Sequence, residues 1–144
     1  MKTAGAVTRR PALQAVSLAA SIANAPAAVA CLRVARFVER EEHIDWARRI
    51  VSWTDTHLQD KDGLFFDNVR VEDGHVAKFK MTYNSGLMIR ANLGLFRATG
   101  DRRFLDEAVR IGRACDSLVD PKSGVYKNAL RFTHLLVEAD LELY

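Results

Sequence analysis

The chain has 144 residues, a length that fits one domain, and 49% of them are apolar, which is enough to form a hydrophobic core. The 21 basic and 18 acidic residues give a formal net charge of +3, and the arginines are scattered rather than gathered in one stripe, so no nucleic-acid partner is expected. No stretch reaches the ~18 uninterrupted apolar residues of a membrane span, so no membrane span is expected either.

Residues 1–23 support two readings. A basic start, "MKTAGAVTRR", precedes the moderately apolar "PALQAVSLAASI" and the sequence "ANA", which resembles a signal-peptidase site. Against cleavage stand the long basic start, the polar residues Gln14, Ser17 and Ser21, and Pro26 just after the cut. We therefore expect an N-terminal extension or lead-in helix over residues 1–23 in preference to a signal peptide, and both a cytoplasmic and a secreted location stay open.

Apolar residues recur every three or four positions in several segments, which predicts five helices. Their predicted ranges are 25–39, 43–58, 84–98, 101–118 and 127–144. Asn24 is expected to cap the first helix, with Pro26 in its first turn, and Asp101 to cap the fourth. In the second helix the core-facing stripe is Ile44, Ala47, Ile50, Val51, Thr54 and Leu58.

Two internal similarities connect these helices. "HIDWARRI" aligns with "FLDEAVRI", which pairs Ala47 with Ala108, and "IRANLGLF" aligns with "VEADLELY", which pairs Ala91 with Ala139. The repeating unit is a helical hairpin. Repeats of this size predict a stacked or circular array of hairpins rather than an ordinary bundle.

The predicted connections alternate between short and long. The short ones are 40–42 and 99–101, and the long ones are 59–83 and 119–126. An up-and-down array then places every long loop on one face of the scaffold, where binding sites usually lie. Within the longest loop, the pattern of residues 64–81 around Asp73 and Gly74 predicts a small β-hairpin.

Sequence motifs for cofactor or metal chemistry are missing. "DKDGLFFD" fails as a calcium loop, because Leu58 and Val69 would occupy ligand positions. Asp60, Asp62 and Gly63 are expected to form a turn. Cys31 and Cys115 lie in apolar helical patterns without metal-ligand spacing, so they are expected to be small buried hydrophobes. No cofactor and no metal ligand are predicted.

The chain resembles family 76 of the glycoside hydrolases, the α-1,6-mannanases. The resemblance is carried by "APAAVACLRVARF", "HIDWARRIVSWTDTHLQDKDGLFFDNV" and above all "TYNSGLMIRANLGLFRATGDRRFLDEAVRIG". It extends over most of the chain from about Asn24. The implied fold class is all-α, a partial (α/α)6 toroid made of about two and a half helical hairpins, with a small β-hairpin in the long loop. Helices beginning near Asn24, Asn84 and Lys127 would be inner helices, and residues 24–144 would be an incomplete toroid segment.

The resemblance also implies a sugar cleft at the start of an inner helix. Tyr83 and Asn84 match the family pattern Tyr-Asn-Gln-Gly, whereas Ser85 departs from it. An aromatic face can stack on a sugar ring, and an amide can donate to and accept from hydroxyl groups. The expected substrate-binding residues are Tyr83, Asn84, Thr82, Asp67 and Asn68, and the expected partner is a mannan-like oligosaccharide. The structural alternative is that Asn84 caps the helix, that Tyr83 packs against it and that Gly86 permits close packing.

Catalytic residues are not assigned. The catalytic pair of the family is two consecutive aspartates, and this sequence contains no Asp-Asp. A ring of six hairpins with a period near 60 residues would need roughly 350 residues. We therefore expect a fragment of a glycoside hydrolase acting on α-1,6-mannan-type polysaccharide that keeps part of the cleft and is inactive in isolation.

Two alternatives remain at this point. The first is a non-catalytic helical-repeat module that binds a sugar or a protein, or that self-associates through exposed helix faces. The second is a relative of the sugar epimerases, which use similar toroids. Their catalytic histidines have no convincing counterpart among His43, His57, His75 and His134.

Overall fold

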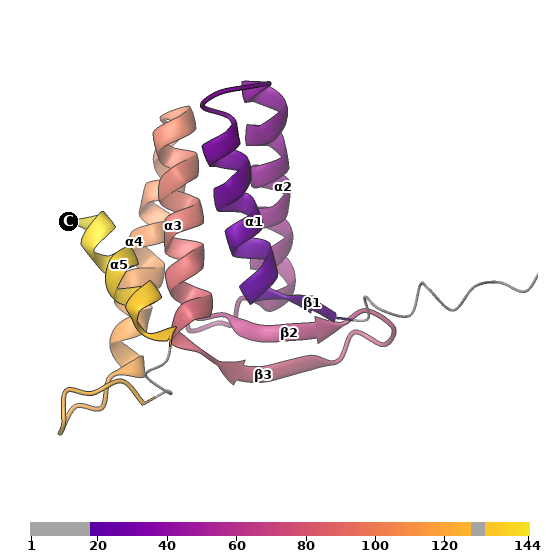
Figure 1. The fold of residues 1–144 in the computed structure, drawn as a ribbon. Helices are drawn as coiled ribbons and strands as arrows, with labels where there is room; N and C mark the ends of the chain where they lie inside the picture. The colour runs from indigo at the N-terminus through magenta and orange to yellow at the C-terminus, as the bar shows by residue number, and fades with distance from the viewer. Residues whose placement is uncertain (1–17, 128–131) are drawn as a thin grey trace, which may run out of the picture.

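The computed structural model describes residues 18–127 and 132–144 (Figure 1). The helices are α1 (Ser21–Val34), α2 (Arg40–Leu58), α3 (Thr82–Thr99), α4 (Arg102–Cys115) and α5 (His134–Leu143), with a 3-10 turn, η1 (Asp116–Leu118), after α4. The strands are β1 (Leu18–Ala20), β2 (Phe66–Arg70) and β3 (Val76–Lys80). The predicted all-α architecture with one small β element is confirmed.

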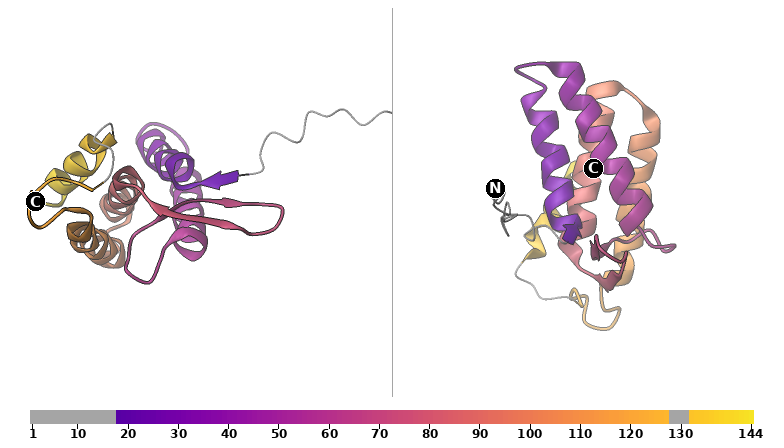
Figure 2. Two further views of the ribbon diagram at one scale, coloured as in Figure 1. Left: turned by 90° about the horizontal axis from the view of Figure 1, so that it is seen from below. Right: turned by 90° about the vertical axis from the view of Figure 1, so that its right-hand side faces the viewer.

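The helices form two layers. Seen along the helix axes, α1, α3 and α5 lie on one side, and α2 and α4 lie on the other (Figure 2). Short turns join α1 to α2 and α3 to α4, so each pair is a helical hairpin, as the repeats predict (Figure 1). The paired alanines of the repeats confirm that equivalence, because Ala47, Ala108, Ala91 and Ala139 are all 0% exposed.

The apolar stripe of α2 is buried as predicted except at Ile50, which is partly buried and packs against the core. Ile44, Ala47, Val51, Thr54 and Leu58 are the buried residues of this helix. Spacings of three and four residues place them on one face, which packs against α1 and α3. The stripe therefore provides the contact between the outer and the inner layer.

Two glycines of α3 allow its neighbours to approach closely. A Cβ atom on Gly86 would lie 2.7 Å from the Cα of Leu136 in α5, and one on Gly94 would lie 2.8 Å from Cδ1 of Leu32 in α1. Both distances are shorter than carbon atoms tolerate. The absence of a side chain at Gly86 and Gly94 is thus what lets α3 sit between α1 and α5.

The β-hairpin predicted in the long loop is confirmed, and a third strand joins it. The strands are antiparallel in the order β1-β2-β3, with Ala19 paired to Val69 and Val69 paired to Val76. Gly74, at φ 70°, lies in the turn between β2 and β3. The sheet crosses the helix ends beneath α1, and the Oγ of Ser21 anchors it by donating to the carbonyl of Phe66 at 2.7 Å (Figure 1).

The predicted boundaries of α1 are wrong at both ends. The helix begins at Ser21 rather than near residue 25 and ends at Val34, so Pro26 lies inside the helix and not in its first turn. Asn24 is not the N-cap, since its side-chain amide donates to Oγ1 of Thr54 in α2 at 3.3 Å. Strand β1 ends at Ala20 and the helix begins directly after it, at Ser21, whose hydroxyl donates to the carbonyl of Phe66.

The other helices differ less from their predicted ranges. Helix α2 begins at Arg40 instead of residue 43, with two acidic residues in its first turn, where the helix dipole favours negative charge. The predicted cap of α4 is confirmed, because Oδ1 of Asp101 accepts from the backbone N–H of Arg103 at 3.0 Å. The fifth helix begins at His134 rather than residue 127.

Several expectations lie outside the described residues. These are the signal-peptide and lead-in readings of the first 17 residues and the part of the predicted fifth helix that covers residues 128–131. Among the helices that are described, none has the length and apolar character needed to cross a membrane.

Candidate functional site

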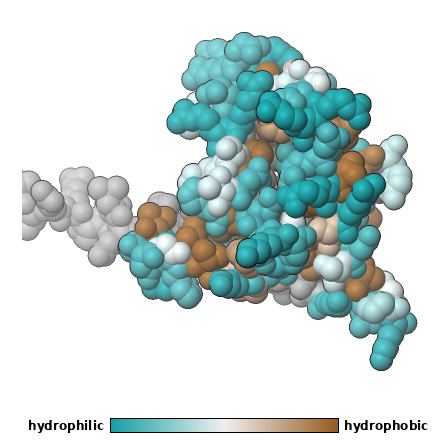
Figure 3. Space-filling model, turned by 180° about the vertical axis from the view of Figure 1, so that it is seen from behind, coloured by the Kyte–Doolittle hydropathy of each residue, from teal (hydrophilic) through white to brown (hydrophobic). Residues whose placement is uncertain are grey.

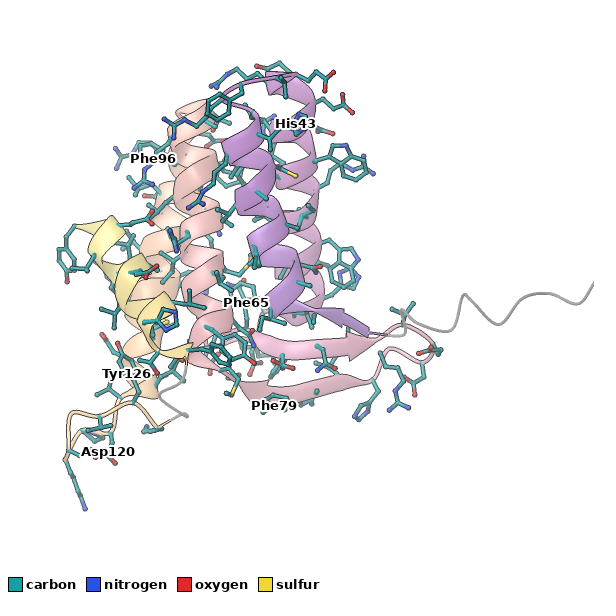
Figure 4. The ribbon with its side chains drawn as sticks, in the orientation of Figure 1. His43, Phe65, Phe79, Phe96, Asp120 and Tyr126 are labelled. Carbon is teal, nitrogen blue, oxygen red and sulfur yellow. The ribbon has the colours of Figure 1, made fainter. Side chains whose placement is uncertain are left out.

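Long connections gather at one end of the molecule. Helices α1, α3 and α5 all begin at the end where the sheet lies, and the segments between α2 and α3 and between α4 and α5 are there too (Figure 1). Figure 4 shows Phe65, Phe79, Asp120 and Tyr126 at this loop end, and His43 at the opposite turn end. The prediction that the long loops lie on one face is confirmed. Binding residues are therefore expected at the loop end, because binding sites usually lie on long loops.

Asp67 of β2 is the centre of a polar cluster at the loop end. Its Oδ1 accepts hydrogen bonds from the hydroxyl of Tyr83 at 3.1 Å and from Nδ2 of Asn84 at 3.3 Å. Its Oδ2 accepts from Nδ2 of Asn68 at 2.8 Å. The hairpin strand and the first turn of α3, which are 16 residues apart at Asp67 and Tyr83, are therefore joined through one carboxylate. We call Asp67, Asn68, Tyr83 and Asn84 the Asp67 cluster.

Burial divides the five predicted site residues into two groups. Thr82, Tyr83 and Asn84 are 1%, 9% and 0% exposed, whereas Asp67 and Asn68 are intermediate. Only Asp67 and Asn68 therefore present part of their side chains to solvent. Tyr83 is 9% exposed, so little of its ring is open for the predicted stacking on a sugar in this arrangement.

Asn84 carries an unused acceptor. Its side-chain oxygen is buried, and within the described residues no donor lies within hydrogen-bond distance. Leaving a buried polar atom unpaired costs about 1–3 kcal/mol, so such atoms need a reason. In this cluster the amide of Asn84 holds Asp67 on one side and keeps its acceptor oxygen free on the other.

The environment of Tyr83 keeps its phenol protonated. Burial raises the pKa of the Tyr83 hydroxyl above its usual value, and the hydrogen bond to the Asp67 carboxylate and its negative charge raise it further. The ring of Phe132 meets the Tyr83 ring edge-on, with centroids 5.4 Å apart and an interplanar angle of 87°. Tyr83 is thus a fixed donor to Asp67.

The capping alternative for Asn84 is wrong. The N-cap of α3 is Met81, which makes no side-chain capping bond, and the Asn84 side chain reaches Asp67 instead. The packing alternative for Gly86 is confirmed by the close approach of Leu136. The start of α3 therefore combines helix packing with a polar contact to the hairpin.

Asp60 and Asp62 form the turn that the sequence predicts. Oδ1 of Asp62 accepts from the backbone N–H of Leu64 at 3.0 Å, and Gly63 has φ 89°. Lys80 at the end of β3 donates to both carboxylates, at 2.5 Å to Asp60 and 2.6 Å to Asp62. The hydrogen bond from Lys80 lowers the pKa of Asp60. This arrangement ties the hairpin to the preceding turn.

Sequence reasoning missed a second polar cluster, between α2 and α4. Asp55 and Glu107 face a hollow of about 430 Å³, where Gln59 Nε2 donates to Glu107 Oε1 at 2.8 Å and Arg110 makes two bonds to the Glu107 carboxylate. Burial raises the pKa of Asp55 to about 7, the Glu107 charge adds to that rise, and Arg110 opposes it. No local motif indicates this cluster, because it forms only where side chains at the end of α2 and on α4 come together.

The cysteines are structural. Cys115 is 4% exposed, and burial raises the pKa of its thiol to about 12, which makes it unreactive. Cys31 is partly buried and packs against the core. The prediction of a small buried hydrophobe is confirmed for Cys115, whereas Cys31 is only partly buried. Among the described residues, no group of three His, Cys, Asp or Glu side chains is placed to hold a metal ion.

The sequence matches one family model and one characterised enzyme. The model, described as glycosyl hydrolase family 76, matches residues 11–139. The mannan endo-1,6-α-mannosidase of Candida glabrata is 38% identical over an alignment of 74 residues, and the match covers 47% of this chain and 16% of that protein.

Two solved structures show the same fold. A family 76 α-mannanase from Bacteroides thetaiotaomicron superposes with a TM-score of 0.81 at 27% identity, over 88% of this chain and 36% of that one. The α-1,6-mannanase of Salegentibacter sp. superposes with a TM-score of 0.80 at 29% identity, over 88% of this chain and 40% of that one. That enzyme was solved with α-1,6-mannotetraose as an inactive variant in which two consecutive aspartates are replaced by alanine. The chain spans less than half the length of each of these relatives.

Proposed function

The chain belongs to glycoside hydrolase family 76, and we propose that it contributes part of a cleft that binds α-1,6-linked mannan. Its fold is a segment of an α/α toroid, in which α1, α3 and α5 are inner helices and α2 and α4 are outer ones. The observation that carries the proposal is the Asp67 cluster at the loop end of the inner helices.

In this proposal Asp67 and Asn68 contact the sugar directly. Both are partly exposed on β2, and a carboxylate beside an amide can accept from and donate to neighbouring hydroxyl groups of one mannose ring. Three donors already surround Asp67, so its carboxylate is oriented before a ligand arrives. Such preorganisation lowers the entropic cost of binding.

Thr82, Tyr83 and Asn84 act behind these two residues. All three are buried; in this proposal Tyr83 and Asn84, which donate hydrogen bonds to Asp67, position its carboxylate, and Thr82 is the first residue of the same helix. The side-chain oxygen of Asn84, which has no hydrogen-bond partner in the described residues, is a further acceptor close to the Asp67 carboxylate. A sugar hydroxyl group reaches it only if the side chains that bury it move. The set of binding residues expected from the sequence is thus divided into direct contacts and supports.

In this proposal the chain alone does not hydrolyse mannan. Cleavage of a glycosidic bond requires two carboxyl groups on either side of the scissile bond. Asp67 is a single carboxylate, its lone pairs already accept three hydrogen bonds, and the sequence contains no consecutive aspartates. We expect binding of the oligosaccharide without release of reducing ends.

The test is calorimetric titration of the full chain with α-1,6-mannotetraose. Replacing Asp67 by Asn keeps the shape but places an amide against the donors Tyr83 and Asn84, so the affinity should fall by about tenfold. The matched control is Asp73→Asn in the exposed hairpin turn, which should change the affinity by less than about twofold. If Asp67→Asn and Asp73→Asn bind the tetrasaccharide with equal affinity, or if the unmodified chain does not bind it, the proposed mannan-binding cleft is refuted. Mannose release by the pure chain would refute the proposed inactivity alone.

One observation favours a second function, that of a self-associating helical module. Leu93 of α3 is 3% exposed, whereas its counterpart in the repeat, Leu141 of α5, is 72% exposed. Val137 on α5 and Tyr144 directly after it are exposed as well. Contiguous apolar surface of this kind favours association. Sedimentation velocity of the unmodified chain and of Leu141→Glu would detect it, since the charge should dissociate any oligomer formed through α5.

A further inference from the structure

Five arginines surround one hollow at the turn end of the molecule. The hollow has a volume of about 610 Å³ and lies between α1 and α3. The arginines are Arg33, Arg36, Arg40, Arg90 and Arg97, which come from α1, the following turn, α2 and α3. Segments far apart in the sequence thus bring positive charge to one place. From behind, the turn end is covered mainly by hydrophilic residues (Figure 3).

The arginines are incompletely neutralised. Glu142 of α5 is the one acidic residue lining the hollow in the described part of the chain. It is shared, because Arg90 Nε and Arg97 Nη1 each lie 2.9 Å from its carboxylate. Arg90 also pairs with Glu138 at 3.0 Å. The carboxylate of Glu138 therefore pairs with Arg90, which already pairs with Glu142, and leaves the other arginines without an additional partner.

Three arginines have little or no carboxylate compensation. Arg40 donates to the carbonyl of Ala98 at 2.7 Å and has only a loose contact of 3.9 Å with Glu41. Arg33 and Arg36 have no ion-pair partner within residues 18–127 and 132–144. Both are exposed, so their guanidinium groups are available to a ligand.

A purely structural reason for these arginines is their position at helix ends. Helices α1, α3 and α5 all end here, and Arg33 and Arg97 lie in last turns, where the dipole favours positive charge. Each helix end carries only about half a negative charge, and that charge is local. Arg36 follows α1, outside that helix, and the hollow keeps an excess of positive charge after Glu138, Glu142 and the helix ends are counted.

Part of the lining of the hollow is apolar. It contains Val29, Leu32 and Gly94, and the missing side chain at Gly94 brings α3 against Leu32. The planar guanidinium groups of arginines bind phosphate oxygens in pairs, and the exposed Arg33 and Arg36 are open to such a ligand. We propose that this hollow is a binding site for an anion that carries two or more phosphate charges.

The proposed anion site is separate from the Asp67 cluster. Asn84 and Arg97 are both on α3, and at 1.5 Å per residue they are roughly 20 Å apart along the helix axis. The two ends of α3 therefore carry two different chemistries. The anion site does not depend on mannan binding, and either can fail without the other.

The test uses the full chain and two probes that share the phosphate chemistry. Inorganic tripolyphosphate, titrated by calorimetry in a chloride buffer, represents a soluble ligand. Phosphatidylcholine vesicles containing phosphatidic acid, assayed by co-sedimentation, represent a lipid headgroup. If only tripolyphosphate binds, the ligand of the site is a soluble phosphate. If the vesicles bind as well, and the variant described below weakens that binding, the ligand is a lipid headgroup.

The informative variant is Arg33→Gln with Arg36→Gln. Both side chains are exposed and unpaired in the described residues, so the fold should persist, which circular dichroism checks. The affinity for the bound probe should fall by about tenfold or more, because two charge-assisted contacts are lost. The charge-matched control is Arg48→Gln with Arg102→Gln on the outer helices, which should reduce the affinity by no more than about twofold. Failure of both probes to bind, or an equal loss in the control, would overturn the proposal.

Discussion

The hydroxyl of Tyr83, at the start of α3, donates a 3.1 Å hydrogen bond to Oδ1 of Asp67 on β2. This bond connects an inner helix of the toroid segment to the hairpin that covers the helix ends. It also fixes the one carboxylate on which the proposed sugar contact rests, so it links the stability of the loop end to its function.

Replacing Tyr83 by Phe should remove that bond and leave the ring packed against Phe132. Hydrogen bonds to charged groups contribute about 1.5–3 kcal/mol, and Asp67 is partly solvated, so we expect the free energy of unfolding to fall by about 1–2 kcal/mol. Urea denaturation measures the change. Tyr126→Phe is the control, because the Tyr126 hydroxyl has no hydrogen-bond partner in the described residues, and it should alter the stability by less than about 0.5 kcal/mol.

The same bond predicts an alkaline dependence. The pKa of Tyr83 is raised in the folded chain, so above the pKa of an unfolded tyrosine, about 10, the unfolded state loses its proton first. The stabilisation by Tyr83 is present below that pH and is lost as the pH rises through the folded pKa. The difference between the unmodified chain and Tyr83→Phe should therefore shrink in alkaline buffer, and a difference that grows would contradict the assigned bond.

Gly86→Ala should destabilise the contact between α3 and α5. The added Cβ would lie 2.7 Å from the Cα of Leu136 and 3.0 Å from its backbone nitrogen, so the helices must move apart. Overpacking of this kind costs about 1–3 kcal/mol, more than the gain in helix propensity of up to about 1 kcal/mol. In Gly112→Ala the new methyl group would meet only the end of the Leu143 side chain, which can rotate away. Thermal unfolding should show a lower midpoint for Gly86→Ala and an unchanged or higher one for Gly112→Ala; the reverse order would be incompatible with the packing described.

Asp55→Asn should stabilise the chain at neutral pH. Asp55 has a folded pKa of about 7 and an unfolded value near 3.8, so between these pH values the unfolded state binds fewer protons and stability falls as the pH rises. The slope is at most about 1.4 kcal/mol per pH unit, and the Asn variant lacks it. Denaturation curves at acidic and neutral pH should show similar stabilities near pH 4 and a more stable variant near pH 7. A variant that is less stable at neutral pH would show that ionised Asp55 has a partner in the folded state.

The helices could be predicted because they depend on local sequence patterns, such as apolar spacing, capping residues and turn residues. The stripe of α2, the cap at Asp101 and the hairpin turn at Gly74 all depend on residues close in sequence. The repeats added the hairpin architecture, since the buried alanines of one helix recur in its counterpart. Boundaries were less predictable, as α1 shows, because its start follows strand β1 and depends on the long-range contact of Ser21 with Phe66.

Long-range contacts could not be predicted from such patterns. Residues Leu18–Ala20 form strand β1 because they pair with β2, which lies about 50 residues later in the sequence. The three residues of β1 do not by themselves require a strand. Asp67 was among the expected binding residues, but its place as the acceptor for Tyr83, Asn84 and Asn68 appears only when the hairpin meets α3. The resemblance to a family indicated where to look, and the fold determined which side chains are exposed.

The most direct test of the central claim, that the Asp67 cluster contacts mannan, is a chemical-shift titration of the isotopically labelled chain with α-1,6-mannotetraose. We predict that the largest shifts occur at the backbone amides of Asp67 and Asn68 and at the side-chain amide of Asn84. Shifts confined to other surfaces, such as the exposed Trp46 on α2, or none at all, would contradict it.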